Sequence, residues 1–122
     1  MSEAVLEPEI ISRQQDGDKY QLLLKVPGSL HYFEGHFDQA QILPGVVQID
    51  WAVKLGKACF AIRGEFKRLE VIKFQQVIVP ESRVCLDLSF DQGTHKLYFS
   101  YRLNDRAVSS GRVVFAEVQH DI

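Results

Sequence analysis

Residues 46–62 form the stretch that most limits what this chain can fold into. Its apolar positions recur at helical spacing, but they cover most of the helix circumference instead of a single stripe. A helix that is apolar on so many sides has to be covered on several of them. The apolar positions are Val46, Val47, Ile49, Ala52, Val53, Leu55, Ala58, Cys59 and Ile62.

The rest of the chain predicts strands that can cover this helix. The Asp16-Gly17-Asp18 turn joins the first two strands into a hairpin, and the last four are expected to form a meander of long hairpins. No second long helical pattern occurs, so one sheet has to wrap around the helix. The strands are expected over residues 7–12, 19–26, 65–75, 83–90, 96–103 and 106–117.

The expected fold is therefore α+β, with an antiparallel sheet of about six strands wrapped around one long central helix. We expect a single domain over residues 1–122. One sheet around one helix is thin for a chain of this length. Its free face and edges favour pairing with a second copy about a two-fold axis.

Composition restricts the partners. A net charge of -2 argues against a general nucleic-acid binder. The sequence has no apolar run of membrane-spanning length and no signal-peptide pattern, so we expect no membrane insertion and a cytoplasmic location. Cys59 and Cys85 lie in apolar segments and are expected to be free thiols. No Cys/His set has the spacing of zinc ligands, so we expect no metal.

The candidate site lies in residues 34–55. His36 stands in an aromatic loop, Pro44-Gly45 follows, and Asp50 is the only acid in the second turn of the predicted helix. A loop base, a helix start and a helix acid are together a reaction site in outline. The N–H of Gly45 is an unsatisfied donor at the positive end of the helix dipole, and a glycine admits close approach of a ligand.

These residues resemble a known motif. His36-Phe37, then Leu-Pro-Gly-Val-Val at residues 43–47, then Asp50, resemble the active-site motif of 3-hydroxyacyl-acyl-carrier-protein dehydratases, which have the hotdog fold. The resemblance covers residues 30–117, including Phe-Gln-Gln-Val-Ile-Val-Pro at residues 74–80 and the closing hairpin at residues 97–116. The short chain looks most like the compact dehydratases of aryl-polyene gene clusters.

The resemblance implies a role for each site residue. His36 would be the base that takes the C2 proton, with the Ile42 carbonyl accepting from its other ring nitrogen and setting the tautomer. Gly45 would donate its N–H to the thioester oxygen, and Asp50 would protonate the leaving hydroxyl. The family shares each site between two subunits of a homodimer and uses no cofactor beyond the phosphopantetheine that carries the substrate.

The resemblance also predicts the surroundings of these groups. Val46 and Phe74 would line the acyl chain, on the helix wall and the strand facing it. Asp50 would be buried among Val46, Ile49 and Val53, and burial disfavours an ionised carboxyl.

A local excess of basic residues suits an acidic partner, which the resemblance identifies as the acyl carrier protein. The alternative is a solvated charged face. Between residues 51 and 79 the charges are Lys54, Lys57, Arg63, Lys67, Arg68 and Lys73 against Glu65 and Glu70.

Other interpretations stay open. Asp50 could pair with Lys54 at i+4 on an exposed edge, and Gly45 could be only a tight joint. A hotdog acyl-thioesterase would hydrolyse instead of eliminating. A catalytically silent acyl-binding subunit is favoured by Asp38, Gln41 and Lys54, because the family usually has proline at the first two positions and often glutamine at the third.

Overall fold

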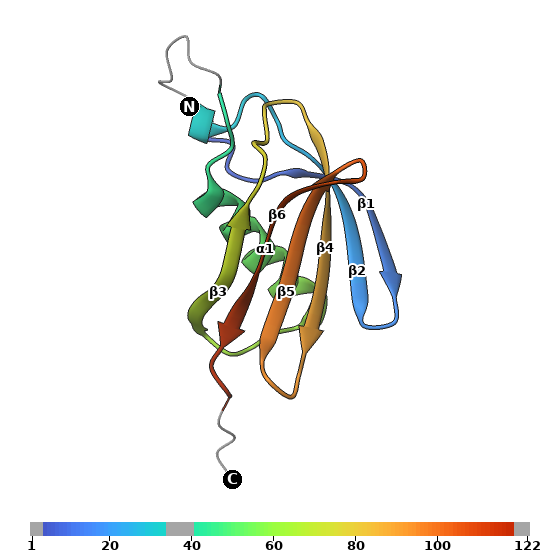
Figure 1. Cartoon of the computed structure of the whole chain (residues 1–122), viewed down its shortest axis with the longest axis vertical. Coiled ribbons are helices and arrows are strands. Elements are labelled where there is room, and N and C mark those ends of the chain that lie inside the picture. Colours follow the sequence, from blue (N-terminus) through green and yellow to red (C-terminus); the bar gives the residue numbers. More distant parts are fainter. Residues whose placement is uncertain (1–3, 34–40, 119–122) are drawn as a thin grey trace.

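The computed structural model describes residues 4–33 and 41–118. One helix and six strands make up most of this part of the chain (Figure 1). In chain order the elements are β1 (Glu9–Asp16), β2 (Lys19–Lys25), the 3₁₀ turn η1 (His31–Phe33), α1 (Gly45–Phe60), β3 (Phe66–Phe74), β4 (Arg83–Asp91), β5 (Lys96–Leu103) and β6 (Arg106–Phe115).

The six strands form one antiparallel sheet in the order β1-β2-β4-β5-β6-β3, and α1 lies across one of its faces (Figure 1). The predicted sheet around one helix is confirmed. The predicted four-strand meander is wrong in one respect, because only β4, β5 and β6 are consecutive neighbours. β3 pairs with β6 and forms the far edge, since the chain crosses the sheet between β3 and β4.

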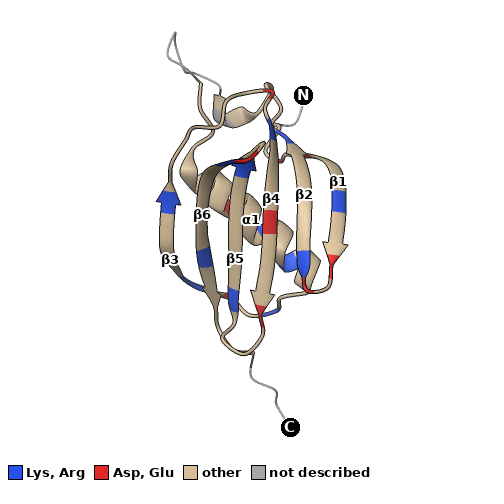
Figure 2. Cartoon of the chain, turned by 45° about the vertical axis from the view of Figure 1, so that its right-hand side comes forward, with Lys and Arg blue, Asp and Glu red and all other residues tan. Residues whose placement is uncertain are grey.

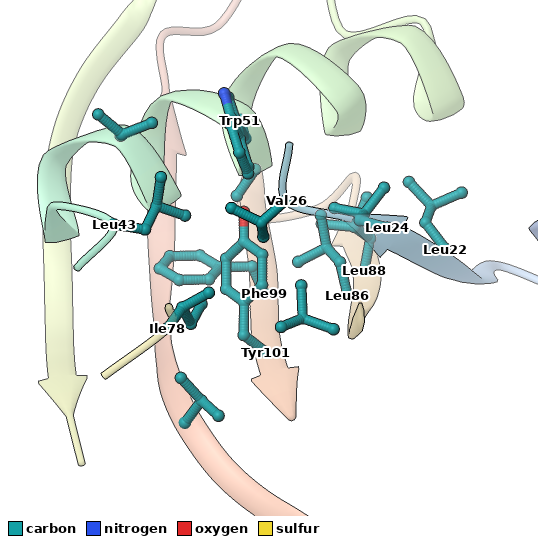
Figure 3. Close-up of a cluster of buried hydrophobic side chains, with 14 of the residues drawn as sticks. Leu22, Leu24, Val26, Leu43, Trp51, Ile78, Leu86, Leu88, Phe99 and Tyr101 are labelled. Atoms are coloured by element: carbon teal, nitrogen blue, oxygen red, sulfur yellow. The ribbon is translucent and has the colours of Figure 1, made fainter. Parts of the chain in front are cut away.

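The core lies between the sheet and α1. Strand side chains alternate between buried and exposed, as in β2 and β5, so every second residue points toward the helix. Trp51 from α1 and Tyr101 from β5 are fully buried and meet near the centre of this layer (Figure 3). The helix places five buried residues here, which are Val47, Gln48, Trp51, Ala52 and Gly56.

The N-terminal segment covers another side of α1. The indole N–H of Trp51 donates to the carbonyl of Leu6 at 3.0 Å, and Val5 bridges to Leu30. The prediction of a helix covered on several sides is therefore only partly met in the single chain. Val46, in the first turn, remains 73% exposed. No helix in the described ranges is long and apolar enough to cross a membrane.

β3 is an edge strand with apolar side chains in the open. Its pairing to β6 is interrupted twice, and Val71 adopts a positive φ of 47° that β-branched residues rarely take. An apolar edge strand with free backbone groups is a template for pairing with another chain. The exposed apolar residues of β3 and the segment after it are Phe66, Leu69, Val71, Phe74, Val77 and Val79.

Charged residues are spread over all six strands (Figure 2), and one cluster of them gathers around Glu70. Glu70 of β3 accepts hydrogen bonds from Arg68 at 2.9 Å and Arg112 at 2.6 Å, and pairs with Lys96 at 3.1 Å. The hydrogen bonds from Arg68, Arg112 and Lys96 lower the pKa of Glu70 to about 2. This cluster joins β3 to β5 and β6 on the side away from the helix.

Candidate active site

The start of α1 has no side-chain cap. Pro44 precedes the helix with extended backbone, and its carbonyl accepts from the N–H groups of Val47 at 3.1 Å and Gln48 at 3.2 Å. Pro44, at the cap position, makes no side-chain cap hydrogen bond. The N–H groups of Gly45 and Val46 are therefore donors at the positive end of the helix dipole. Such an end can stabilise an anionic oxygen.

The segment leading into the helix is held from two sides. The N–H of Leu43 donates to the carbonyl of Ile78 at 2.8 Å, which ties it to the connection after β3. The carbonyl of Leu43 accepts from the side-chain amide of Gln48 at 3.2 Å. Leu43 is itself buried, so the position of the helix start depends on the core beneath it.

The sequence interpretation missed the polar cluster below this segment. Gln48 Oε1 accepts from the Ser109 hydroxyl at 2.6 Å, and the Gln48 carbonyl accepts from the Tyr101 hydroxyl at 2.7 Å. Figure 3 shows Tyr101 reaching toward the helix from the sheet. Gln48 interrupts an otherwise apolar face, and that interruption was the available signal. Its partners on the sheet, Tyr101 and Ser109, lie more than fifty positions away and could not be predicted from it.

Gly45 lies directly beside the ring of Phe74. A side-chain carbon on Gly45 would lie 2.5 Å from Cζ of the Phe74 ring, so a larger residue there would displace this half-exposed ring. Phe74 is 51% exposed and Val46 is also in the open, so both present apolar surface beside the helix start. Gly45 thus has a packing reason as well as the proposed chemical one.

Asp50 differs from its predicted state. Its side chain is 44% exposed in the single chain and lies 3.0 Å from the ammonium of Lys54. The prediction that Val46, Ile49 and Val53 bury it is wrong here, because Val46 points into solvent. The alternative interpretation, an i+4 pair on an exposed edge, describes the geometry. Lys54 also contacts Glu7 at 3.2 Å, so the N-terminal segment takes part in this cluster.

The two acidic partners of Lys54 both favour its charged form. Hydrogen bonds to Asp50 and then Glu7 raise the pKa of Lys54 and keep it protonated. Burial, and then the nearby charge of Asp50, raise the pKa of the Tyr101 hydroxyl. Tyr101 therefore stays neutral and acts as a hydrogen-bond donor.

His36 lies outside the described residues, so its distance to Ile42, Gly45 or Asp50 stays a prediction. The described residues that flank it are joined, because the side-chain amide of Gln41 donates to the carbonyl of Phe33 at 3.1 Å. Ile42 is 43% exposed. Gln41, one of the departures from the family motif, thus has a structural contact of its own.

Two hollows among the described residues lie away from this site. These hollows, of about 540 and 480 Å³, lie on the outer face of the sheet and beyond the C-terminal end of α1. Neither is lined by Gly45, Asp50 or Phe74. In residues 4–33 and 41–118, no group of three or more His, Cys, Asp or Glu side chains could hold a metal ion.

Two solved structures are similar to this chain, and each match covers nearly the whole length of both proteins. A chain of the dehydratase heterocomplex ApeI:P from Xenorhabdus doucetiae is 31% identical, with a TM-score of 0.84, over 91% of this chain and 99% of that one. An uncharacterized protein from Erwinia carotovora subsp. atroseptica is 33% identical, with a TM-score of 0.79, over 91% and 97%.

A more distant structure shares the fold. The dehydratase domain from the CurF module of curacin polyketide synthase is 16% identical, with a TM-score of 0.65, over 95% of this chain and 45% of that one. A search of curated proteins found no significant match. The family model for the ApeI-like dehydratases, described as ApeI dehydratase, matches residues 12–112. This chain has the hotdog fold and belongs to the ApeI-like dehydratase family.

Proposed function

We propose that this dehydratase removes water from 3-hydroxyacyl thioesters carried on the phosphopantetheine of an acyl carrier protein, giving trans-2-enoyl thioesters. The substrates belong to fatty-acid or polyene-type biosynthesis, and the aryl-polyene type is the nearest match in motif. The observation that carries the proposal is the uncapped helix start at Gly45, with an acid further along the same helix, in a chain of a dehydratase family.

The proposed reaction has three parts. His36 takes a proton from C2, and the N–H of Gly45 stabilises the negative charge that develops on the thioester oxygen. Asp50 gives a proton to the hydroxyl leaving C3, so the products are water and the enoyl thioester. His36 then releases its proton to solvent and Asp50 takes one up, which restores both groups for the next cycle. The protein contributes no cofactor to these steps.

A second subunit would complete the site. Asp50 is half-exposed in the single chain, and the exposed apolar surface at the start of the same helix includes Val46 and Phe74. Pairing of two β3 edges about a two-fold axis would cover that surface, and a covered carboxyl is more readily protonated. We propose a homodimer in which His36 of one chain faces Asp50 of the other.

The carrier protein would dock beside β3. In the described part of the chain, no salt bridge engages Arg63, Lys67 or Lys73, and all three are exposed. Lys54 and Arg68 already have acidic partners. Lys67→Glu and Lys73→Glu should therefore raise KM for a carrier-bound substrate while leaving KM for the matching pantetheine thioester unchanged.

Hydration of a trans-2-enoyl carrier thioester tests the proposal, with dehydration of the 3-hydroxyacyl thioester as the reverse assay. Wild type should be active, and His36→Ala and Asp50→Asn should each lose at least about 100-fold in kcat. Ile49→Val is a matched control on the same helix and should retain activity. A wild type that turns over neither thioester, or two site variants with full rate, would contradict the proposal. Hydrolysis of a saturated acyl thioester would identify a thioesterase instead.

Mixing the two inactive variants tests the shared site. Mixed dimers should regain up to about a quarter of the wild-type rate, because random pairing combines one intact His36 with one intact Asp50 in half of the dimers and each such dimer keeps one site. No recovery in demonstrably mixed dimers would place both groups in one chain.

A second candidate function is a catalytically silent acyl-binding subunit. It is favoured by the Glu7–Lys54–Asp50 cluster, which occupies the proposed acid in the single chain. The similar Xenorhabdus doucetiae chain belongs to a heterocomplex. This candidate predicts that purified protein is inactive alone and that His36→Ala does not impair the activity of an assembled complex.

A further inference from the structure

Gln48 is the one polar side chain among the buried residues of α1. It is 2% exposed, and both ends of its amide are engaged. Nε2 donates to the carbonyl of Leu43 at 3.2 Å, and Oε1 accepts from the Ser109 hydroxyl at 2.6 Å. Its own carbonyl accepts from the Tyr101 hydroxyl at 2.7 Å. One residue thus links the approach to the helix with β5 and β6.

The position of Gln48 in the helix explains why its side chain can reach the residues that precede the helix. Helical side chains tilt toward the N-terminus, so a residue in the fourth helical position reaches back over the first turn. In many helices an apolar pair joins that position to the residue before the cap and sets the angle of entry. Here the same two positions are Gln48 and Leu43, and a buried hydrogen bond joins them instead of an apolar contact.

A hydrogen bond in this position is more directional than an apolar contact. It orients the Leu43 carbonyl, and therefore the peptide planes that lead through Pro44 to the N–H of Gly45. The second anchor, from Leu43 N–H to the Ile78 carbonyl, holds the other side of the same residue. No buried side-chain nitrogen or oxygen in residues 4–33 and 41–118 lacks a partner, so the hydrogen bonds of the cluster are fully satisfied.

We propose that Gln48 is a positioning residue for the dehydration site, which sets the location of the Gly45 N–H donor through the Leu43 carbonyl. The inference rests on the proposed function. Gln48 does not touch the substrate. An oxyanion donor has to be in place before negative charge develops on the oxygen. A shift of the donor therefore reduces stabilisation of the transition state more than it reduces affinity for the substrate.

The test compares three variants at a temperature well below unfolding. Gln48→Met has nearly the same volume but removes both side-chain hydrogen bonds, leaving the Ser109 hydroxyl and the Leu43 carbonyl unpaired. Ser109→Ala removes one partner and keeps the bond to Leu43. Gln48→Met/Ser109→Ala removes the buried unpaired hydroxyl, so it should regain thermal stability relative to Gln48→Met. It still lacks the bond to Leu43.

We expect kcat to fall about 10- to 100-fold in both variants that carry Gln48→Met, with KM within about threefold of wild type. Ser109→Ala should stay within about threefold of wild type in both constants, because Gln48 still holds Leu43. Amide hydrogen exchange in residues 43–47 should quicken in the two Gln48→Met variants and not in Ser109→Ala. Recovery of kcat together with stability in the double variant would reduce Gln48 to a purely structural residue and overturn the inference.

Two further outcomes separate the inference from the proposed function. If wild type dehydrates the thioester and Gln48→Met keeps its kcat, the positioning role is wrong and the function stands. If wild type is inactive, the function is wrong, and the exchange measurement alone decides whether Gln48 holds the helix start. Unchanged exchange in residues 43–47 then overturns the positioning role as well.

Discussion

Gly56 is in contact with the core at a place where any side chain would collide. A carbon added there would overlap Cδ2 of Leu97, with Cδ1 2.9 Å and Cγ 3.2 Å away. Leu97 is fully buried on β5, so its side chain is enclosed by other core residues. Gly56→Ala should therefore be destabilising even though alanine is the better helix former.

The size of the effect comes from two opposing contributions. Replacing glycine by alanine inside a helix stabilises by about 1 kcal/mol through propensity alone. Forcing an extra carbon into a close-packed core costs about 1–3 kcal/mol. We expect Gly56→Ala to lose about 1 kcal/mol of unfolding free energy, which lowers Tm by about 4 °C in a chain of this length.

Urea and thermal unfolding by circular dichroism, at one fixed protein concentration, measure this loss. A second variant supplies the control. Leu97→Ala alone should cost about 3 kcal/mol through the cavity it leaves. In that background the collision is gone, so Gly56→Ala should become neutral or stabilising by up to about 1 kcal/mol. A rise in Tm for Gly56→Ala alone, or the same loss in both backgrounds, would refute the steric reasoning.

Three other predictions follow from described contacts. The arginine and lysine partners of Glu70 lower its pKa to about 2. The contribution of the ionised Glu70 to stability is therefore fully present above its ordinary pKa and is lost as pH falls toward 2. The Tm difference between wild type and Glu70→Gln should shrink between about pH 4.5 and 2. Tyr101→Phe removes the side-chain donor to the Gln48 carbonyl and should cost about 0.5–1.5 kcal/mol in urea unfolding. Gly45→Ala should lose at least about tenfold in kcat, since the added carbon meets the Phe74 ring, and Phe74→Ala should restore part of the rate if the collision is the cause.

Much of the fold follows from local pattern. The apolar spacing of residues 46–62 predicts a helix there. The observed α1 begins one residue earlier and ends at Phe60. Clear period-two alternation predicts β4 almost to the residue, and the turn signals and β-prone residues around them do the same for β2 and β5. β1 is placed less well, because it lies fully exposed at the sheet edge and runs to Asp16, where exposure leaves no apolar alternation to mark its end.

The sequence by itself thus determined the helix, the strands and the spacing of His36, Gly45 and Asp50, because these depend on neighbours along the chain. Only the tertiary structure decided that β3 lies beside β6, that Phe74 covers Gly45, and that Gln48 is held by β5 and β6. It also decided that Asp50 is half-exposed and paired with Lys54 in the single chain. Burial and partner choice depend on residues that are distant in sequence, and periodicity within one segment carries no information about them.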